Sequence, residues 1–427
     1  MTVTIELPYG EQKLPVSCPD EIEWELPPPP DSRRRRRPEF LARQGAASLV
    51  RQLRQRGAST GERVLLVVPD TTRRCGLETL LPPLIAGLVR ELAAPIEIAV
   101  ATGSHPPPTP ADLAALLGTE ALRRCPVHVH DAHNGSELHD FGPTRAGTPV
   151  WLNRVLLSAD WIVTVNAVVL HYFAGLGGGP KMVLPGLAGL ETITANHRRA
   201  LTDRGGFAPG CREGHTSGNP VWEDLAEVVP LFPRWLSLQV VLDRQGQLTA
   251  VHAGPPIPVQ QRLSRILADT ARVPLRRPAD IVLAGTGPAG INLVQAHKAI
   301  HHACLAARPG GVVIVCAPCP QGIGSDSFLA WFARGRSEEI AAGLSRGYTL
   351  NGHTALALRQ KSERFHLIFH SSLPAEVVSA TGMIPVTTLA RAWEIARSFL
   401  PAGPLHGVIL EDAAATMPQV QEEGRTD

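Results

Sequence analysis

The chain has 427 residues, of which 44% are apolar and 19% are formally charged, and its net charge at pH 7 is +2. Single hydrophobic cores stop growing at roughly 250–300 residues, so this length predicts two domains. The balanced charge excludes a protein built mainly to bind polyanions, and the apolar share excludes a largely disordered chain.

Lysine is scarce in this sequence. The 41 basic residues include only four lysines, at Lys13, Lys181, Lys298 and Lys361, and the others are arginines. A compositional bias explains the preference for arginine, but it does not explain why lysine is kept at these four positions.

The seven cysteines are dispersed, and the first ten residues lack the basic stretch and apolar run of a secretory signal. We therefore expect a reduced protein of the cytoplasm rather than a disulfide framework. Residues 161–180 carry no formal charge, yet they contain Asn166, His171 and a glycine cluster. This pattern predicts a buried strand that leads into a glycine loop, not a membrane span.

The N-terminal region, residues 1–45, combines a strand-like segment, a proline-rich segment and a run of five arginines from Arg33 to Arg37. Such a run either binds nucleic acid or forms a solvated arm. No aromatic residue interleaves with the arginines to stack on bases, which favours the solvated arm.

From residue 46 onward, helical and strand patterns alternate, as is typical of parallel α/β units. Helices are predicted at 46–57, 77–94 and 109–125, and strands at 63–70, 96–105, 127–133 and 161–171. A proline-rich stretch and an amphipathic helix then precede a second series of strands at 279–290, 310–319 and 365–372. We therefore expect an N-terminal α/β domain over 1–265 and a C-terminal α/β domain over 266–427.

Polar residues and glycines follow three of the apolar strands, where open α/β sheets bind ligands. The first group is Asp70, Thr71 and Arg73, and the second runs from Thr102 to His105. The third runs from His171 through a glycine cluster to Lys181 and continues to Asn196 and His197. Glycine backbone can approach an anion closely, and a neighbouring lysine can neutralise phosphate or act as a nucleophile. The spacing is not that of a P-loop.

A second glycine motif, G-T-G-P-A-G at 285–290, matches the dinucleotide-binding pattern. No acidic residue stands about 20 positions later, where a ribose contact is expected. Gln295 and Lys298 instead share one face of the next helix and could hold a small carboxylate. Cys316 and Cys319 lack a second pair at zinc spacing, and a histidine cluster at 128–139 is either a polar surface or an opportunistic metal site.

Taken together, these motifs resemble the nickel-dependent lactate racemase family, whose members are 2-hydroxy acid racemases and epimerases. The resemblance rests on TGSH at 102–105, H-x-FAG-x-x-GG-x-K-x-x-x-PG from His171, NH at 196–197 and Q-x-x-K at 295–298. It extends from about Val67 to Ala357. It implies two α/β domains with the active site between them, and a nickel-pincer nucleotide as cofactor.

The resemblance also implies a role for each matching residue. Lys181 would attach the cofactor through a thioamide, and His197 would ligate the nickel, for which imidazole is a suitable ligand. His105 and His171 would be the paired acid/base groups, because two enantiomers place their hydroxyls differently. The substrate carboxylate would be bound by Arg73, Gln295 and Lys298. The nucleotide would be held in part by Asp70, Thr71, Gly175, Gly177 and Gly178.

The partners implied are a small 2-hydroxy acid and the enzymes that synthesise and load the cofactor, without nucleic acid or membrane. Arg74 stands where many relatives have proline, and Pro180 where a basic residue is common, so the choice among lactate, malate and larger substrates stays open. Two other interpretations remain: an NAD-dependent 2-hydroxy acid dehydrogenase, and a non-catalytic carrier of the nucleotide or an organic acid.

Overall fold

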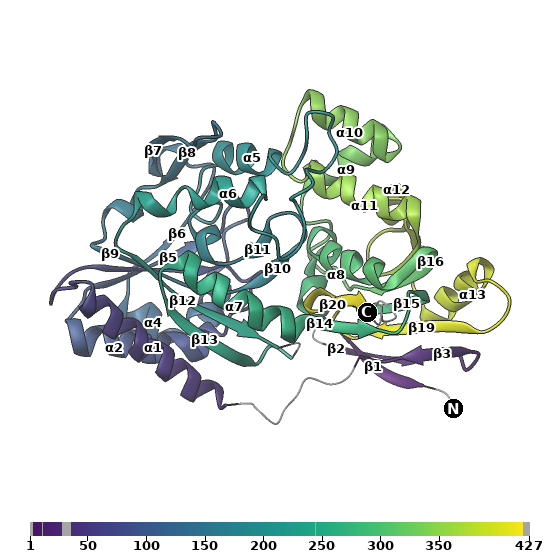
Figure 1. Cartoon of the computed structure of the whole chain (residues 1–427), viewed down its shortest axis with the longest axis horizontal. Helices are drawn as coiled ribbons and strands as arrows, with labels where there is room; N and C mark the ends of the chain where they lie inside the picture. The colour runs from purple at the N-terminus through teal and green to yellow at the C-terminus, as the bar shows by residue number, and fades with distance from the viewer. Residues whose placement is uncertain (1–2, 11, 28–35, 244, 422–427) are drawn as a thin grey trace, which may run out of the picture. The chain divides into compact units, whose positions relative to one another are not determined.

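The computed structural model describes residues 3–10, 12–27, 36–243 and 245–421. The chain forms two compact units (Figure 1). Unit 1 comprises Met1–Pro30, Leu201–Gly206 and Ala271–Asp427, and unit 2 comprises Asp31–Ala200 and Phe207–Thr270. Each unit contains a six-stranded sheet flanked by helices, so the two-domain α/β prediction is confirmed.

The sheet of unit 2 has the order β13-β12-β9-β4-β5-β6. All neighbours are parallel except the edge strand β13, which runs antiparallel to β12. Every residue of β4 and β9 is buried, which matches the continuous apolar runs expected for parallel strands. The strands are β4 (Val64–Pro69), β5 (Ile96–Ala101), β6 (Val127–Val129), β9 (Trp161–Ala167), β12 (Trp235–Leu242) and β13 (Leu248–Gly254).

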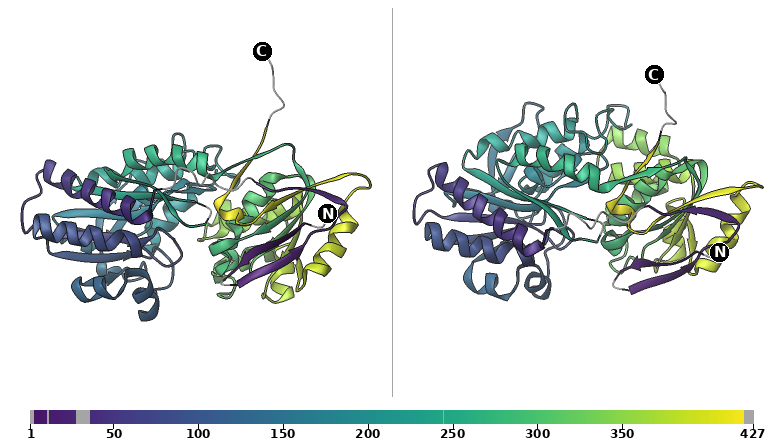
Figure 2. Two further views of the ribbon diagram at one scale, coloured as in Figure 1. Left: turned by 90° about the horizontal axis from the view of Figure 1, so that it is seen from below. Right: turned by 60° about the horizontal axis from the view of Figure 1, so that its bottom comes forward.

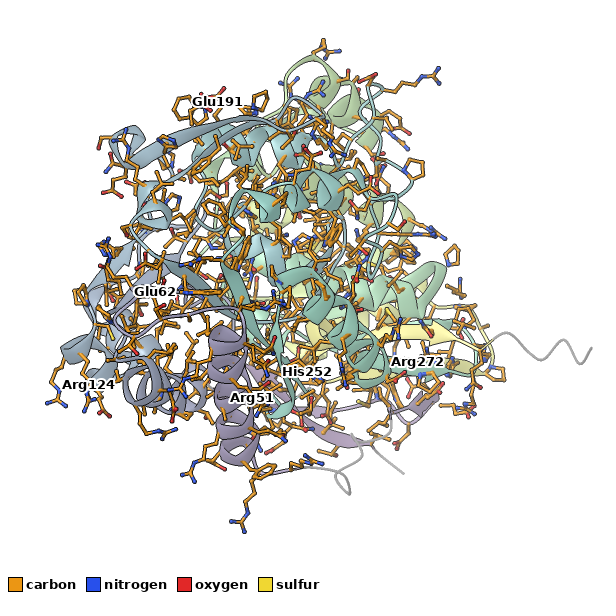
Figure 3. All side chains as sticks on the ribbon, turned by 60° about the vertical axis from the view of Figure 1, so that its left-hand side comes forward. Arg51, Glu62, Arg124, Glu191, His252 and Arg272 are labelled. Carbon is orange, nitrogen blue, oxygen red and sulfur yellow. The ribbon has the colours of Figure 1, made fainter. Side chains whose placement is uncertain are left out.

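Helices α1 (Pro38–Gln55) and α2 (Leu77–Leu92) share a hydrophobic core with the sheet of unit 2. Their polar faces carry charge toward solvent, as Arg51 on α1 shows (Figure 3). The segment predicted as one helix at 109–125 is two helices, α3 (Pro110–Leu117) and α4 (Thr119–Arg124), because Gly118 adopts a positive φ of 76° between them. Thr109 caps α3 in a capping box with Asp112.

The other face of this sheet carries polar side chains. Asn166 on β9 and Gln239 on β12 are register partners on parallel strands, so their side chains project from the same face. Gln239 donates to the carbonyl of Pro256, the first residue of α7 (Pro256–Ala271), at 2.6 Å. The remaining elements of unit 2 are the hairpins β7 (Leu138–Pro143)–β8 (Pro149–Asn153) and β10 (Val169–His171)–β11 (Gly175–Gly177), the helices α5 (Leu190–Arg198) and α6 (Pro220–Ala226), and the 3₁₀ turn η4 (Gly179–Met182).

The sheet of unit 1 is parallel throughout, with the order β18-β17-β16-β15-β19-β3. Its strands are β3 (Ile22–Glu25), β15 (Ala279–Gly285), β16 (Ala307–Cys316), β17 (His366–His370), β18 (Ile384–Val386) and β19 (Leu405–Leu410). A separate two-stranded sheet pairs β14 (Arg272–Leu275) with β20 (Met417–Val420). The helices are α8 (Leu293–Ala306), α9 (Asp326–Ala330), α10 (Ser337–Arg346), α11 (Gly352–Arg364), α12 (Ala375–Ala380) and α13 (Leu389–Phe399).

The N-terminal strands belong to unit 1, not to the N-terminal domain that the sequence suggested. Strand β3 pairs with β19, and the hairpin β1 (Thr4–Tyr9)–β2 (Gln12–Ser17) contributes Leu7 and Val16 to the same core (Figure 2). The division therefore falls at 270/271 rather than 265/266, and α7 stays with unit 2. A strand that pairs with residues almost the whole chain away leaves no local signal of its partner.

Two further sequence expectations concern the arginine run and the uncharged window. Residues 33–35 lie outside the described residues, while the Arg36 guanidinium lies 5.9 Å from the Phe40 ring centroid. The window at 161–180 forms strands and a glycine loop as predicted. Across the described ranges, no helix is both long and apolar enough to span a bilayer.

The packing of β3 on β19 predicts that Gly407→Ala destabilises the protein. An added Cβ would lie 2.5 Å from the Trp24 ring, so the ring must move and the free energy of unfolding should fall by about 1–3 kcal/mol. Urea unfolding followed by tryptophan fluorescence measures this loss. The matched control is Gly347→Ala, where nothing lies within 4 Å of the added Cβ. Equal stabilities of the two variants would contradict the pairing.

Candidate active site

The first part of the candidate site forms where β4 and β5 end side by side. These strands are parallel, with Pro69 opposite Ala101, so the residues that follow them emerge at the same edge of the sheet. There the His105 Nδ1 atom lies 2.6 Å from Asp70 Oδ2. Asp70 is buried, whereas the His105 side chain is 33% exposed. The pair is thus anchored on its carboxylate side and accessible on its imidazole side.

A tight turn after β4 holds the carboxylate of Asp70 in place. Asp70 Oδ1 accepts hydrogen bonds from the backbone N–H of Thr72 at 3.1 Å and from its hydroxyl at 2.7 Å. Arg73 in turn donates to the Thr72 hydroxyl at 2.8 Å. Burial raises the pKa of Asp70, but the hydrogen bond and charge of His105, the charge of Arg73 and the Thr72 hydrogen bond together lower it below its usual value.

The ionised carboxylate fixes the tautomer of His105. A carboxylate only accepts hydrogen bonds, so Nδ1 of His105 must donate to Asp70. In the neutral ring, Nε2 then carries the lone pair and can accept a proton. Thr71, the remaining predicted residue of this turn, is exposed.

His171 is the last residue of β10, and its Nδ1 accepts a hydrogen bond, whereas Nδ1 of His105 donates one. It pairs with Gly175 in the β10–β11 hairpin, and the backbone N–H of Ala174 donates to its Nδ1 at 3.2 Å. Since Nδ1 accepts, the neutral ring carries its proton on Nε2. The two predicted acid/base histidines therefore present different Nε2 atoms, a lone pair on His105 and an N–H on His171.

Lys181 lies in the 3₁₀ turn η4 that follows the glycine cluster. Burial and the charge of Arg73 lower the pKa of its amine from the ordinary 10.5 to about 7. A substantial fraction of the amine is therefore unprotonated and nucleophilic at neutral pH.

One aromatic ring joins three of the sequence-predicted residues. The Phe173 ring centroid lies 4.5 Å from that of His171, 5.3 Å from that of His197 and 5.6 Å from Lys181 Nζ. Phe173 lies within the motif from His171 to Lys181, but its sequence position predicts no role of its own. The structure makes it the common contact of the residues predicted to attach the cofactor, ligate nickel and transfer protons.

His197 lies on α5, and a buried carboxylate anchors the residues on either side of it. Asp224 of α6, which is 2% exposed, accepts from Asn196 Nδ2 at 2.8 Å and forms an ion pair with Arg199 at 3.2 Å. Two threonine hydroxyls, of Thr144 and Thr148, complete its hydrogen bonding. Asp224 had no sequence signal, because a buried carboxylate of this kind is defined only by partners from distant segments.

The three predicted nucleotide-binding glycines pack closely against their own chain. An added Cβ would lie 1.9 Å from the His215 carbonyl oxygen at Gly175, 2.6 Å from Val169 at Gly177 and 2.3 Å from the Ala167 carbonyl oxygen at Gly178. Internal packing therefore accounts for glycine at these positions. Contact of the loop with a nucleotide stays a prediction.

In unit 1, Gln295 and Lys298 meet on α8 as their spacing predicted, with Lys298 Nζ donating to Gln295 Oε1 at 2.8 Å. The preceding glycine motif does not have the open backbone that a dinucleotide needs. Added Cβ atoms would lie 2.2 Å from the Glu411 carbonyl oxygen at Gly285 and 2.5 Å from the Asp412 side chain at Gly287. The chain itself occupies these approaches, which weakens the dehydrogenase interpretation.

The remaining sequence features are the cysteine pair, Arg74 and the histidine cluster. Cys316 and Cys319 are buried, and burial raises the pKa of each thiol to about 12. Arg74 is exposed. Within the described part of the chain, no group of three or more His, Cys, Asp or Glu side chains is arranged to hold a metal, and this includes the histidines at 128–139.

Comparison with known proteins decides the family. Residues 9–207 match the model of the lactate racemase N-terminal domain, and residues 275–410 match that of the lactate racemase C-terminal domain. The chain belongs to the lactate racemase family. Lactate racemase of Thermoanaerobacterium thermosaccharolyticum is 27% identical over 351 residues, covering 80% of this chain and 81% of that protein. Lactate racemase of Lactiplantibacillus plantarum is 28% identical over 269 residues, or 62% of each chain.

Two solved structures are similar to this chain. The lactate racemase apoprotein of Thermoanaerobacterium thermosaccharolyticum superposes with a TM-score of 0.85 at 25% identity, over 98% of this chain and 100% of that chain. A Thermotoga maritima protein shares the fold, with a TM-score of 0.70 at 18% identity over 90% of this chain and 98% of its own.

The environment of Lys181 predicts unusual amine reactivity in the unloaded protein. Acetylation by acetic anhydride should titrate with a midpoint near the pKa of about 7, because only the neutral amine reacts. Lys13, whose pKa an ion pair with Glu6 raises above 10.5, is the internal control. Peptide mass spectrometry over pH 6–11 measures both rates. A Lys181 midpoint as high as that of Lys13 would contradict the buried environment.

Proposed function

We propose that this member of the lactate racemase family is an isomerase that racemises lactate or a related 2-hydroxy acid with a nickel-pincer nucleotide attached to Lys181. One observation carries the proposal. The Lys181 amine, His171 and His197 meet at the Phe173 ring, in the same unit as the Asp70–His105 pair.

The side chains fit the proposed cofactor. Forming an amide-like bond requires a neutral amine, and the pKa of about 7 supplies one at Lys181. An imidazole is a suitable nickel ligand, and His197 is held near this lysine by its contact with Phe173. When bound, the nucleotide would supply an electrophilic ring that accepts and returns hydride.

The chain's own residues would transfer the hydroxyl proton of the substrate and bind its carboxylate. Removing hydride from Cα requires a base to take the hydroxyl proton, which leaves a 2-keto acid. The Nε2 lone pair of His105 suits this step, and Asp70 stabilises the imidazolium that results. The Nε2–H of His171 suits the return of a proton to the keto oxygen from its other side. Exchanging these roles converts the opposite enantiomer.

The substrate is expected to be recognised through its carboxylate. Arg73 matches a planar carboxylate with a bidentate fork, and we propose it as the first contact. The roles of Gln295 and Lys298 in carboxylate binding, and of Asp70, Thr71 and the loop glycines in nucleotide binding, stay predictions. We also propose loading by cofactor-synthesis enzymes in the cytoplasm, and no nucleic-acid or membrane partner.

Racemisation of a pure enantiomer tests the function. The protein, co-expressed with cofactor-synthesis enzymes, should carry nickel and a Lys181 mass increment, and it should abolish the circular dichroism of L- or D-lactate or of another 2-hydroxy acid. His105→Ala should lower the rate by about 10²–10⁴-fold with nickel retained. If no member of a lactate, malate and aromatic panel loses optical activity with loaded protein, the proposal fails. NADH formation would favour the dehydrogenase, and absence of exchange at Cα would favour the carrier.

Asp70→Asn separates two possible roles of this residue. If Asp70 orients His105, the amide will favour the wrong tautomer and lower kcat by roughly a hundredfold without loss of nickel. If Asp70 instead holds the nucleotide, nickel content should fall in parallel with activity. Thr72→Ser, which keeps the hydroxyl bonded to Asp70, is the matched control and should stay near the parent rate.

A further inference from the structure

Helix α7 carries a buried amide that reaches the glycine loop of the site. Gln260 lies on the first turns of α7 and is 0% exposed. Its Nε2 donates to the carbonyl oxygens of Gly177 at 3.1 Å and Gly178 at 3.0 Å. The segment around Gln260 has the proline-rich composition of a linker, but the Gln260 side chain bonds to the glycine loop of unit 2.

The orientation of this amide is fixed. Gln260 Oε1 accepts from the indole N–H of Trp222 at 3.2 Å, while the two N–H groups of Nε2 serve the two glycine carbonyls. Turning the amide over would place its oxygen against both carbonyls and its NH₂ against the indole N–H. Every hydrogen bond would then become a repulsion, so only one orientation is stable.

The hydrogen bonds from Gln260 to Gly177 and Gly178, which we call the clamp, connect to the backbone of Lys181. The Gly178 carbonyl oxygen that accepts from Gln260 also accepts from the backbone N–H of Lys181, at 3.2 Å. On the other side of the loop, Asn166 Oδ1 accepts from the N–H of Gly179 at 2.9 Å. Two buried amides from different elements thus hold the loop between them.

The loop packs closely against both amides. A Cβ added at Gly179 would lie 2.8 Å from the Gln260 amide, and one added at Gly178 would lie 2.4 Å from Asn166 Oδ1. Both glycines have positive φ, 76° at Gly178 and 56° at Gly179, a conformation that other residues rarely adopt. The backbone conformation before Lys181 therefore depends on glycine and on these two amides together.

We propose that Gln260 is the positioning residue for Lys181: it holds the glycine loop so that the amine stays partly shielded from water. The attachment of a cofactor there rests on the proposed function, whereas the placement of the amine does not. Without the clamp, the loop would relax toward solvent and the amine would regain water. Gln260 would then act on loading without touching the substrate.

Acetylation of unloaded full-length protein tests the placement. The amine nitrogen of Lys181 attacks a carbonyl of acetic anhydride, a C–N bond forms, the C–O bond to acetate breaks and a proton is released. In Gln260→Leu and Gln260→Glu the midpoint of the pH profile should rise from about 7 toward 10.5, and the rate at pH 7 should fall by about tenfold or more. Trp222→Phe, which only frees the amide to turn, should shift the midpoint less in the same direction.

Gln239→Leu is the matched control. Gln239 is also a fully buried amide that holds α7, through the carbonyl of Pro256, and it lies on the strand next to that of Asn166. Its loss should lower stability without moving the acetylation midpoint. An unchanged midpoint in folded Gln260 variants, or an equal shift in Gln239→Leu, would overturn the proposal.

Loaded protein supplies a second measurement. After co-expression with cofactor-synthesis enzymes, the fraction of chains with the Lys181 mass increment should fall about tenfold in the Gln260 variants and remain at the parent value in Gln239→Leu. If the parent carries no increment at all, the proposed function fails, while the acetylation profiles still decide the role of Gln260. If the parent is loaded and the Gln260 variants load equally, the positioning role is refuted.

Discussion

A partly buried amine that senses the charge of a guanidinium is the constraint on which the candidate site depends. Taking Lys181 out of water beside Arg73 disfavours its charged form, and the resulting pKa of about 7 makes the neutral amine available. An amine so placed tends to move back to water unless the backbone prevents it. The hydrogen bonds of Gln260 and Asn166 to the glycine loop supply that restraint.

The two histidines show how neighbours give one residue type two different hydrogen-bonding states. A carboxylate against Nδ1 of His105 leaves a lone pair on Nε2, whereas a backbone N–H against Nδ1 of His171 leaves a proton there. The proposed racemisation, which moves a proton in both directions between mirror-related substrates, would use this complementarity. The neighbour of His105 is the Asp70 side chain, which follows β4, and the neighbour of His171 is the backbone of the β10–β11 hairpin.

Much of the fold was accessible from local sequence. Continuous apolar runs such as Val64–Pro69 identified buried parallel strands, and Thr109 marked the start of a helix. The division into domains was less accessible, because β3 pairs with β19 some 380 positions away. Helix α7 follows a proline-rich stretch, and the predicted boundary at 265/266 falls within it, although all of α7 except Ala271 belongs to unit 2.

The sequence by itself determined which chemical groups are present and their spacing. The TGSH, glycine-loop, NH and Q-x-x-K motifs suggested the family, which the two domain matches then confirmed. Only the tertiary structure decided that Phe173 contacts His171, His197 and Lys181. It also decided that Asp224 bonds to Asn196 next to His197, and that Gln260 bonds to the glycine loop before Lys181. Local patterns reflect burial and backbone preference over a few residues, whereas a hydrogen bond between positions 178 and 260 exists only after distant segments have packed.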